Sequence, residues 1–472
     1  MSYNFLAYEQ DQLFLMPPSL TEWVGEESLA RFVSDVVDTL ETEGELRPFY
    51  AHYRSDGWGR AAYHPRMMVK VLLYGYSVGV RSSRKLAAAL EESVPFRYLA
   101  ANQQPDFRTI SDFRKEHLEA LEALFVDVLR LCEEAGLVKL GRVALDGRKV
   151  AASAALDQNR KREGLEREIR RIFEEAERLD AEEEEAHGAD RRGDELPRGL
   201  ATKADRLRRL KEARARLVAE EEEAKAAQAE KIREREEEER RTGKKKRGRK
   251  PKPPEAVVDR EKKANVTDPD SRIMKTRRGW VQGYNAQAMA DCESQVIVAQ
   301  DVTEEENDVG QLGPMLERCE AQAGRRPDAC LADAGYWSEE NAALEDDRTE
   351  LFVATTKEWK QRKAQREQGA PRGRMPKSLG DKERMERKLR TKRGRAAYKE
   401  RASTIEPVFG QMEGRGLNRF LLRGKRKAAG EWSLFCTTHN LLKLWRSGWR
   451  VAPTKVAVAR SGAGAGALAG AG

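Results

Sequence analysis

The chain has 472 residues, enough for two or three domains and at least one sizeable core. Charged residues make up 36% of the chain, and no stretch is long and apolar enough to span a bilayer, so we expect a cytoplasmic protein without membrane contact. The formal net charge of +8 favours a polyanionic partner but does not identify one.

The cysteines argue against a disulfide framework. All five are scattered, with no CxxC pair, which also gives no zinc-ligand spacing and fits a reducing compartment. The histidines are equally dispersed, and we interpret them as structural. The five cysteines are Cys132, Cys292, Cys319, Cys330 and Cys436.

The first part of the chain predicts an all-helical region. Apolar residues recur at spacings of three and four over residues 29–37 and 67–75. A short helix is expected over 82–90. The sequence Thr109-Ile-Ser-Asp112 resembles a capping box, and it predicts one further helix from there to about residue 132.

These short helices carry basic residues that admit two interpretations. One is a helix-turn-helix that reads DNA, and the other is an ordinary helical bundle with a solvated basic face. The pattern alone leaves both open. The residues concerned are Arg81, Arg84, Lys85, Arg97, Arg108 and Arg114.

The composition changes sharply over residues 158–241, which are dominated by Glu, Arg, Lys and Ala. Apolar residues there step by four and three, as in a coiled-coil seam, and a second, weaker stripe follows a polar turn. We therefore expect an antiparallel helical hairpin that serves as a spacer or dimer contact rather than a regulator. The first stripe is Leu165, Ile169, Ile172, Ala176 and Leu179, and the second is Leu207, Leu210 and Leu217.

A basic run follows at residues 244–254 (KKKRGRKPKPP). Its Arg247-Gly-Arg249 core resembles an AT-hook, in which an arginine pair lies in the narrow minor groove of DNA. Lys250 departs from that motif because it separates Arg249 from the following proline. A disordered basic linker is the alternative interpretation.

Strand patterns surround this charged segment. Residues 142–150 predict one strand, and residues 283–290 and 295–302 predict two strands of a hairpin. The short apolar runs at 329–332 and 351–354 are typical of buried strands, with a helix between them. The order of strands and helices predicts a mixed α/β domain interrupted by the charged segment.

Two aspartates come directly after apolar strand residues. Asp146 follows Val143-Ala-Leu and is expected to end that strand, with Gly147 leaving room beside its carboxylate. Asp333 follows Cys330-Leu-Ala. Phosphodiester cleavage by two divalent ions needs carboxylates held in this way, although a single Asp-Gly after a strand is usually a turn.

Several ordered motifs resemble those of DDE-type insertion-sequence transposases. The segments 398–410 (YKERASTIEPVFG) and 417–424 (LNRFLLRG) are similar to the C-terminal motif of that family, and residues 63–90 to its N-terminal DNA-binding domain. The segments LDGRKVAASA around Asp146, GYNAQ at 283–287, LADAGYWSEEN around Asp333 and Asn440-Leu-Leu-Lys-Leu near the end are also similar.

The resemblance implies a fold and a division into domains. The fold class is α/β, with a ribonuclease H-like mixed sheet and flanking helices, a helical coiled-coil insertion and an all-α N-terminal domain. The expected parts are a helical DNA-binding domain at 1–140, a discontinuous catalytic domain at 141–157 and 266–450, a charged helical-hairpin insertion with a basic AT-hook-like linker at 158–265, and a disordered tail at 451–472.

The resemblance also implies roles for individual residues. Asp146, Asp333 and Glu406 would be catalytic and would hold two Mg²⁺ ions, for which Mn²⁺ could substitute. Arg401 would hold a DNA phosphate or the carboxylate cluster, and Tyr398 would contact the DNA near the scissile bond.

Three departures from the family pattern concern this last motif. Four residues, rather than three, separate Arg401 from Glu406, and Glu413 stands where a lysine is usual, which leaves the basic role open, with Arg415 as a candidate. Pro407 predicts that Glu406 sits at a helix start or a kink. Glu400 and Glu413 are the alternative acids if Glu406 is not a ligand.

The function expected from the resemblance is that of a DNA transposase. It would cleave the ends of a mobile element and join the 3′-OH to target DNA, acting as a homodimer on double-stranded DNA in the nucleoid. The rival hypothesis is a catalytically inactive, transposase-derived DNA-binding protein. A purely structural coiled-coil protein would explain only residues 158–241.

Overall fold

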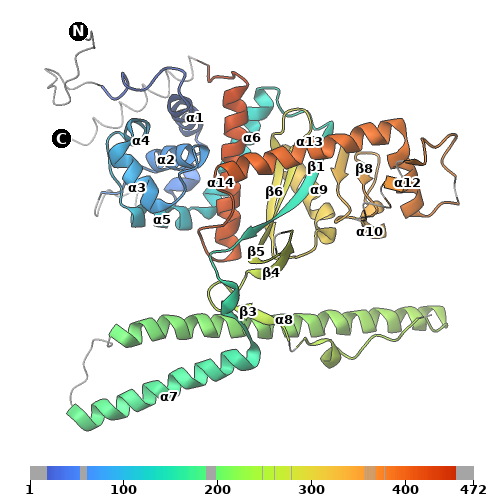
Figure 1. Cartoon of the computed structure of the whole chain (residues 1–472), viewed down its shortest axis with the longest axis horizontal. Coiled ribbons are helices and arrows are strands. Elements are labelled where there is room, and N and C mark those ends of the chain that lie inside the picture. Colours follow the sequence, from blue (N-terminus) through green and yellow to red (C-terminus); the bar gives the residue numbers. More distant parts are fainter. Residues whose placement is uncertain are drawn as a thin grey trace, which may run out of the picture.

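A computed structural model defines the fold and describes most of the chain (Figure 1). The described residues are 19–53, 61–187, 198–246, 248–259, 261–277, 279–356, 358, 361, 363–364, 367–376 and 378–452, with the side chains of 176–187 and 198–204 excepted. Figure 1 shows three parts: a group of short helices, a sheet flanked by helices, and a long helical hairpin beside the sheet.

The N-terminal part is helical, as predicted. The apolar residues expected to form helix faces over 29–37 and 67–75 lie in its first two helices, and Pro65 opens the second. Its helices are α1 (Leu29–Glu43), α2 (Pro65–Ser77), α3 (Ser83–Glu92), α4 (Val94–Leu99), α5 (Phe107–Glu116) and α6 (Leu118–Glu134), with a 3₁₀ turn, η1 (Arg47–Tyr50).

The prediction of one helix from Thr109 to about residue 132 is wrong. The N-cap is Asp106, whose side chain accepts a hydrogen bond of 2.7 Å from the backbone N–H of Thr109. The helix then ends at His117, which has a non-helical backbone (φ −109°, ψ 37°), and α6 begins at the next residue. A cap three residues upstream therefore starts the first of two helices.

The sheet has six strands of mixed direction. Its order is β4-β5-β1-β7-β8, and β6 pairs with β5 as well. β5 is antiparallel to β1, β4 and β6, whereas β7 is parallel to both β1 and β8. The strands are β1 (Arg142–Ala151), β4 (Arg272–Thr276), β5 (Gly279–Asp291), β6 (Ile297–Thr303), β7 (Ala329–Ala332) and β8 (Glu350–Val353).

Five of these strands confirm the sequence prediction, and β4 was not predicted. The helices around the sheet are α9 (Leu312–Ala323), α10 (Glu339–Ala342), α12 (Asp381–Arg390), α13 (Lys392–Gly414) and α14 (Lys425–Arg446). Short 3₁₀ turns are η2 (Leu156–Gln158), η3 (Pro254–Val257) and η4 (Val309–Gln311). α13 packs on β1, β5, β7 and β8, so it lies across the strands that carry both candidate aspartates.

The helix α14 joins the N-terminal helices to the sheet. It packs against α2 and α6 on one side and against β6 on the other, and most of its residues are buried. Trp432 and Phe435 belong to a hydrophobic core that continues through both parts. Glu431, also buried, forms an ion pair of 3.2 Å with Arg81 and accepts hydrogen bonds from the backbone N–H groups of Leu421 and Leu422.

Two of the basic residues considered as DNA contacts are therefore structural. Arg81 is buried against Glu431, and it also donates to the carbonyl of Gly416 at 2.5 Å. Arg114 is buried as well and donates to the hydroxyl groups of Tyr76 and Ser83. Burial removes both guanidinium groups from the surface that DNA could reach.

The charged segment forms a helical hairpin, as predicted. A two-stranded ladder of β2 (Asn159–Lys161) and β3 (Lys263–Asn265) closes its base, and α7 (Arg162–His187) and α8 (Arg198–Thr242) form its arms. The pairs Arg162–Glu221 and Arg206–Glu168 show that the arms run antiparallel. The apolar stripe buries Leu165, Ile172, Leu210, Ala213, Leu217, Ala264 and Val266, with Ile169 and Leu207 at its edge.

Ion pairs attach this hairpin to the sheet. Glu304, just after β6, pairs with Arg216 of α8 and, at 2.9 Å, with Arg272 of β4. Glu220 of α8 pairs with Arg272 as well, and with Lys262 at 2.7 Å. The hairpin is therefore held against the sheet largely by charge.

The basic run returns along the second half of α8 (Figure 1). Arg235 of α8 donates to the backbone carbonyls of Lys246 and Arg249, and the Lys246 side chain is 2.5 Å from Glu238. Arg249 is exposed, and Arg247 lies outside the described residues. The predicted tail lies outside them too, apart from 451–452. Within the described part of the chain, no helix has the length and apolar character needed to cross a membrane.

Candidate active site

The sheet register places the two candidate aspartates side by side. β1 and β7 are neighbouring parallel strands, and Leu145 pairs with Ala332. Asp146 and Asp333 are the residues that follow this pair. Asp333 comes directly after β7, as predicted.

Asp146 does not end its strand. β1 continues to Ala151 because β5 continues to pair with it, from Asp146 opposite Ala288 to Ala151 opposite Gly283. The prediction of a strand end was therefore wrong, and the carboxylate projects from the interior of a strand. An interior strand position holds the Asp146 backbone more firmly than a turn would.

Arg401 connects Asp146 to the third predicted acid. Its Nη1 donates to Oδ2 of Asp146 at 3.0 Å, and its Nη2 is 3.7 Å from Oε1 of Glu406. The Arg401 side chain is 13% exposed, whereas that of Glu406 is 65% exposed. The structure thus favours a contact of Arg401 with the carboxylates, one of the two roles that the sequence left open.

Glu406 lies in the interior of α13, so of the two positions that Pro407 predicted, a helix start or a kink, the helix start is wrong. A proline has no N–H, so it leaves the carbonyl four residues earlier, that of Ser403, without its helical donor. Gln295 supplies a substitute, since its Nε2 donates to the Ser403 carbonyl at 3.1 Å. The hydrogen bond from the β5–β6 turn explains why the helix can continue through Pro407.

The surroundings of Asp146 disfavour its negative charge. Burial first and the neighbouring charge of Asp333 second raise the pKa of Asp146, against the opposing effect of Arg401, to about 6. Because the charge of Asp333 affects the pKa of Asp146, the two aspartates lie close enough to repel each other. A divalent cation would relieve that repulsion.

The donor chemistry fits a hard cation, although no complete ligand set has formed. Two carboxylates on adjacent strands are the oxygen ligands that Mg²⁺ prefers. In the described portion of the chain, however, no three His, Cys, Asp or Glu side chains are grouped closely enough to hold a metal ion. Arg401 occupies the space between Asp146 and Glu406. Asp146 and Asp333 are therefore the residues best placed to hold a metal ion, with Glu406 across Arg401.

The two alternative acids are held in ion pairs with β1. Glu400 receives two hydrogen bonds from Arg142, at 2.7 and 3.0 Å, and Glu413 pairs with Arg148. These contacts fasten α13 to β1 on either side of Arg401. Both glutamates are thus less suited than Glu406 to a ligand role.

Tyr398 and Arg415 occupy different surroundings on α13. Tyr398 is half-buried, and the Arg401 guanidinium lies 6.0 Å from the centroid of its ring. Arg415 instead turns to α14, where its Nη1 donates to the Thr438 carbonyl at 3.4 Å. Burial, followed by repulsion from Arg446, lowers its pKa to about 10. Arg415 is not placed beside Glu406.

Sequence reasoning missed a polar group beside the aspartates. Asp308 follows β6 and is bonded to Lys149 of β1 and to Asn285 and Gln287 of β5. A signal for it exists in the sequence. Asn285 and Gln287 alternate in an otherwise apolar strand, which places two amides on one buried face of the sheet.

Comparisons with known families match both ends of the chain. Residues 18–116 match the family described as Transposase domain (DUF772), and residues 374–445 match the Transposase DDE domain. The second match includes Tyr398, Arg401 and Glu406. No curated protein and no solved structure matches the chain significantly. The two matched domains indicate an insertion-sequence transposase of the DDE type.

Proposed function

We propose that this chain cleaves the ends of its mobile element and joins the released 3′-OH to target DNA by metal-dependent phosphoryl transfer. One observation carries the proposal. Asp146 and Asp333 lie beside each other on parallel strands, and Arg401 links Asp146 to Glu406 of the helix that crosses them. Such a group of carboxylates suits the two-metal chemistry of phosphodiester cleavage.

The arrangement of the sheet supports a ribonuclease H-like catalytic fold. Asp146 lies on the first strand, Asp333 follows the strand next to it, and Glu406 lies on a later helix. The charged hairpin is inserted between β1 and β5, which pair directly in the sheet. The insertion therefore separates β1 from β5 along the chain but does not interrupt their pairing in the sheet.

Asp146, Asp333 and Glu406 would hold two Mg²⁺ ions, or Mn²⁺ in their place. When bound, the ions supply activation of the attacking oxygen and stabilisation of the leaving oxygen. Arg401 orients the Asp146 carboxylate through its hydrogen bond, and it remains within reach of Glu406. Tyr398, next to Arg401, would contact the DNA strand near the scissile bond.

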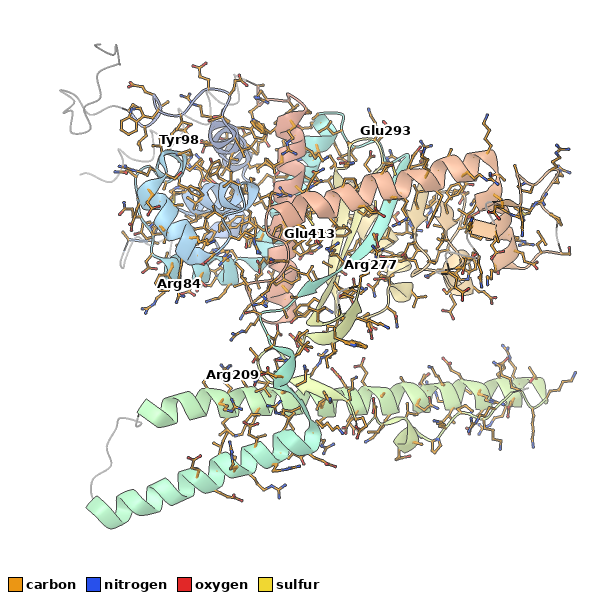
Figure 2. The ribbon with its side chains drawn as sticks, in the orientation of Figure 1. Arg84, Tyr98, Arg209, Arg277, Glu293 and Glu413 are labelled. Carbon is orange, nitrogen blue, oxygen red and sulfur yellow. The ribbon has the colours of Figure 1, made fainter. Side chains whose placement is uncertain are left out.

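The DNA contacts are proposed on two further surfaces. Exposed Arg84 projects at the lower edge of the N-terminal helices (Figure 2), and both it and Arg108 lie over the ring of Phe107. Such cation–aromatic surfaces suit nucleic acid. Arg247 and Arg249 of the basic run would enter the minor groove. We propose that the active form is a homodimer on DNA in the nucleoid.

A strand-cleavage assay with DNA from the flanks of the coding region tests this function. Asp146→Asn, Asp333→Asn and Glu406→Gln should each lower cleavage in Mg²⁺ by at least about a thousandfold, as expected for groups that act as one unit. Glu400→Gln is the matched control on the same helix and should retain most activity, because Glu400 pairs with Arg142.

Three outcomes separate the hypotheses. Cleavage by the two aspartate variants would refute the catalytic assignment. Loss of cleavage in Glu400→Gln but not in Glu406→Gln would transfer the ligand role to Glu400. Wild-type protein that binds the element ends but never cuts them, in Mg²⁺ or in Mn²⁺, would instead support the inactive DNA-binding protein.

A further inference from the structure

A third aspartate lies between the two catalytic ones. Asp308 stands in the loop after β6, directly before η4. Its Oδ1 accepts three hydrogen bonds, from Lys149 Nζ at 2.9 Å, Asn285 Nδ2 at 2.6 Å and Gln287 Nε2 at 3.0 Å. The donors come from β1 and β5, so Asp308 is fastened to the two strands at the centre of the site.

The Asp308 carboxylate also touches the backbone beside each catalytic aspartate. A Cβ atom added to Gly147, the residue after Asp146, would lie 2.5 Å from Oδ1 of Asp308. One added to Gly335, two residues after Asp333, would lie 3.3 Å from Oδ2 of Asp308 and 2.8 Å from Oδ1 of Asp333. Gln287 Nε2 and Asn285 Oδ1 also crowd Gly147, and Asp333 itself is the nearest group to Gly335, so the two glycines leave room for a polar cluster that includes Asp308.

The Asp308 carboxylate has a cationic partner, and a buried tyrosine supports one of its hydrogen-bond donors. Lys149, on the same strand as Asp146, neutralises it, and both side chains are largely buried, at 13% and 19% exposed. Behind it, the buried Tyr336 donates its hydroxyl hydrogen to Oε1 of Gln287, whose amide nitrogen bonds Asp308. Lys149, Gln287 and Tyr336 therefore each make a contact that helps to fix the orientation of Asp308, whereas Oδ1 of Asn285 is buried without a hydrogen-bond partner among the described residues.

Burial raises the pKa of the Tyr336 hydroxyl well above its ordinary value, and the charges of Asp308, Asp146 and Asp333 raise it further. The three negative charges thus all act on this hydroxyl group. This agrees with the contacts at the two glycines, which bring Asp308 near both aspartates.

We propose that Asp308 is a positioning residue, which sets the separation of the Asp146 and Asp333 backbones from the loop between β6 and η4. The inference rests on the proposed function, since it concerns how the cleavage site is held ready. Oδ1 of Asp308 already accepts three hydrogen bonds and so acts as a fixed anchor rather than an open ligand. Groups that orient metal ligands in this way contribute about 10–100-fold to metal affinity or activity.

The test compares Asp308→Asn with Asp301→Asn in the full chain. Asp301 is a matched control because it lies on β6 near the same loop and pairs with Arg318 at 3.0 Å. Four quantities are measured: Mn²⁺ binding by electron paramagnetic resonance, the Mg²⁺ dependence of single-turnover cleavage, affinity for element-end DNA, and the melting temperature.

Asp308→Asn should lower the cleavage rate or Mn²⁺ affinity by about 10–100-fold. DNA affinity and melting temperature should stay near those of the wild type, and Asp301→Asn should match the wild type throughout. Unchanged cleavage and Mn²⁺ binding in Asp308→Asn would overturn the inference while wild-type cleavage upholds the proposed function. A lower melting temperature with unchanged Mn²⁺ affinity would also overturn it, because Asp308 would then be merely structural.

The Mn²⁺ measurement keeps the two hypotheses apart. If the wild type never cleaves DNA, the proposed function fails, and the positioning role is then decided by Mn²⁺ binding alone. Weaker Mn²⁺ binding by Asp308→Asn than by Asp301→Asn would support the inference in that case. Equal binding by the two variants would overturn it.

Discussion

The helices α14 and α8 are both long and both rich in charge at their ends, but they are held in place by different forces. α14 is surrounded by the N-terminal helices and the sheet, and even its charged residue Glu431 is buried. Among the described side chains of α8, only Leu210, Ala213 and Leu217 are buried, and ion pairs to Glu304 and Arg272 fasten it to the sheet.

The difference teaches where stability and sensitivity to salt should reside. Apolar burial and a desolvated ion pair hold α14, so its contacts should be little affected by dissolved salt. The ion pairs of the hairpin are only partly buried, with side chains 10–35% exposed, so they should contribute less than a fully desolvated pair and be more open to screening by salt. The part of the protein around α14 should therefore determine global unfolding, whereas the attachment of the hairpin should respond to ionic strength.

The largest effect is expected from breaking the buried pair. Glu431→Ala would leave Arg81 without its carboxylate and the N–H groups of Leu421 and Leu422 without an acceptor. The free energy of unfolding should fall by about 3–5 kcal/mol, measured by urea denaturation. Glu236→Ala on the exposed face of α8 is the control and should change it by less than about 0.5 kcal/mol. Similar values for the two variants would abolish the contrast between the helices.

An intermediate, pH-dependent effect is expected at Asp127 of α6, which packs against α14. Burial first and the charge of Glu45 second raise the pKa of Asp127 to about 6, against the opposing effect of Arg130. The folded protein therefore holds this proton more tightly than the unfolded chain does. The cost of ionising Asp127 is absent below pH 4 and grows as the pH rises through 6.

Asp127→Asn removes that cost. The variant should melt about 2–4 °C higher than the wild type at pH 7.5, with little difference at pH 4, as followed by calorimetry. A gain that is equal at both pH values would show that ionisation is not its cause. Asp112→Asn, at an exposed position of α5, is the control and should show no such pH dependence.

The smallest effect is expected at the attachment of the hairpin. A double-mutant cycle with Arg216→Met and Glu304→Gln should give a coupling energy below about 1 kcal/mol at low salt. The coupling should vanish in 1 M NaCl, where the screening length is about 3 Å. A coupling energy of several kcal/mol that persists at high salt would show that the hairpin, like α14, is held by contacts that salt does not screen.

The sequence predicted those parts of the structure that repeat a pattern. Strand alternation, helical periodicity and the charged hairpin were each evident from several residues at once, and so were the positions of Asp146 and Asp333 next to apolar strands. Hydrogen bonds and ion pairs between segments that are distant in the sequence could not be predicted from the pattern of either segment alone. Pro407 predicted a helix start or a kink at Glu406, because Gln295, which supplies a donor to the Ser403 carbonyl, comes from a different part of the chain.

The candidate site shows the same limit. Asp308 stands in an acidic loop, Glu304-Glu-Glu-Asn-Asp308, without any periodic signal, and only the fold brings it to Gly147 and Gly335. Arg81 and Arg114 looked like DNA contacts because charge is usually exposed, but their acceptors lie in other helices. The sequence left the role of both arginines open because these acceptors are distant along the chain.

The ladder of β2 and β3 has a consequence for replacing the hairpin. Asn159 pairs with Asn265 and Lys161 with Lys263, so the hairpin leaves and re-enters the fold at one point. A two-residue turn such as Asn-Gly could bridge that point and leave every other strand in register. Replacing the hairpin at this ladder should therefore leave the order of the six-stranded sheet unchanged.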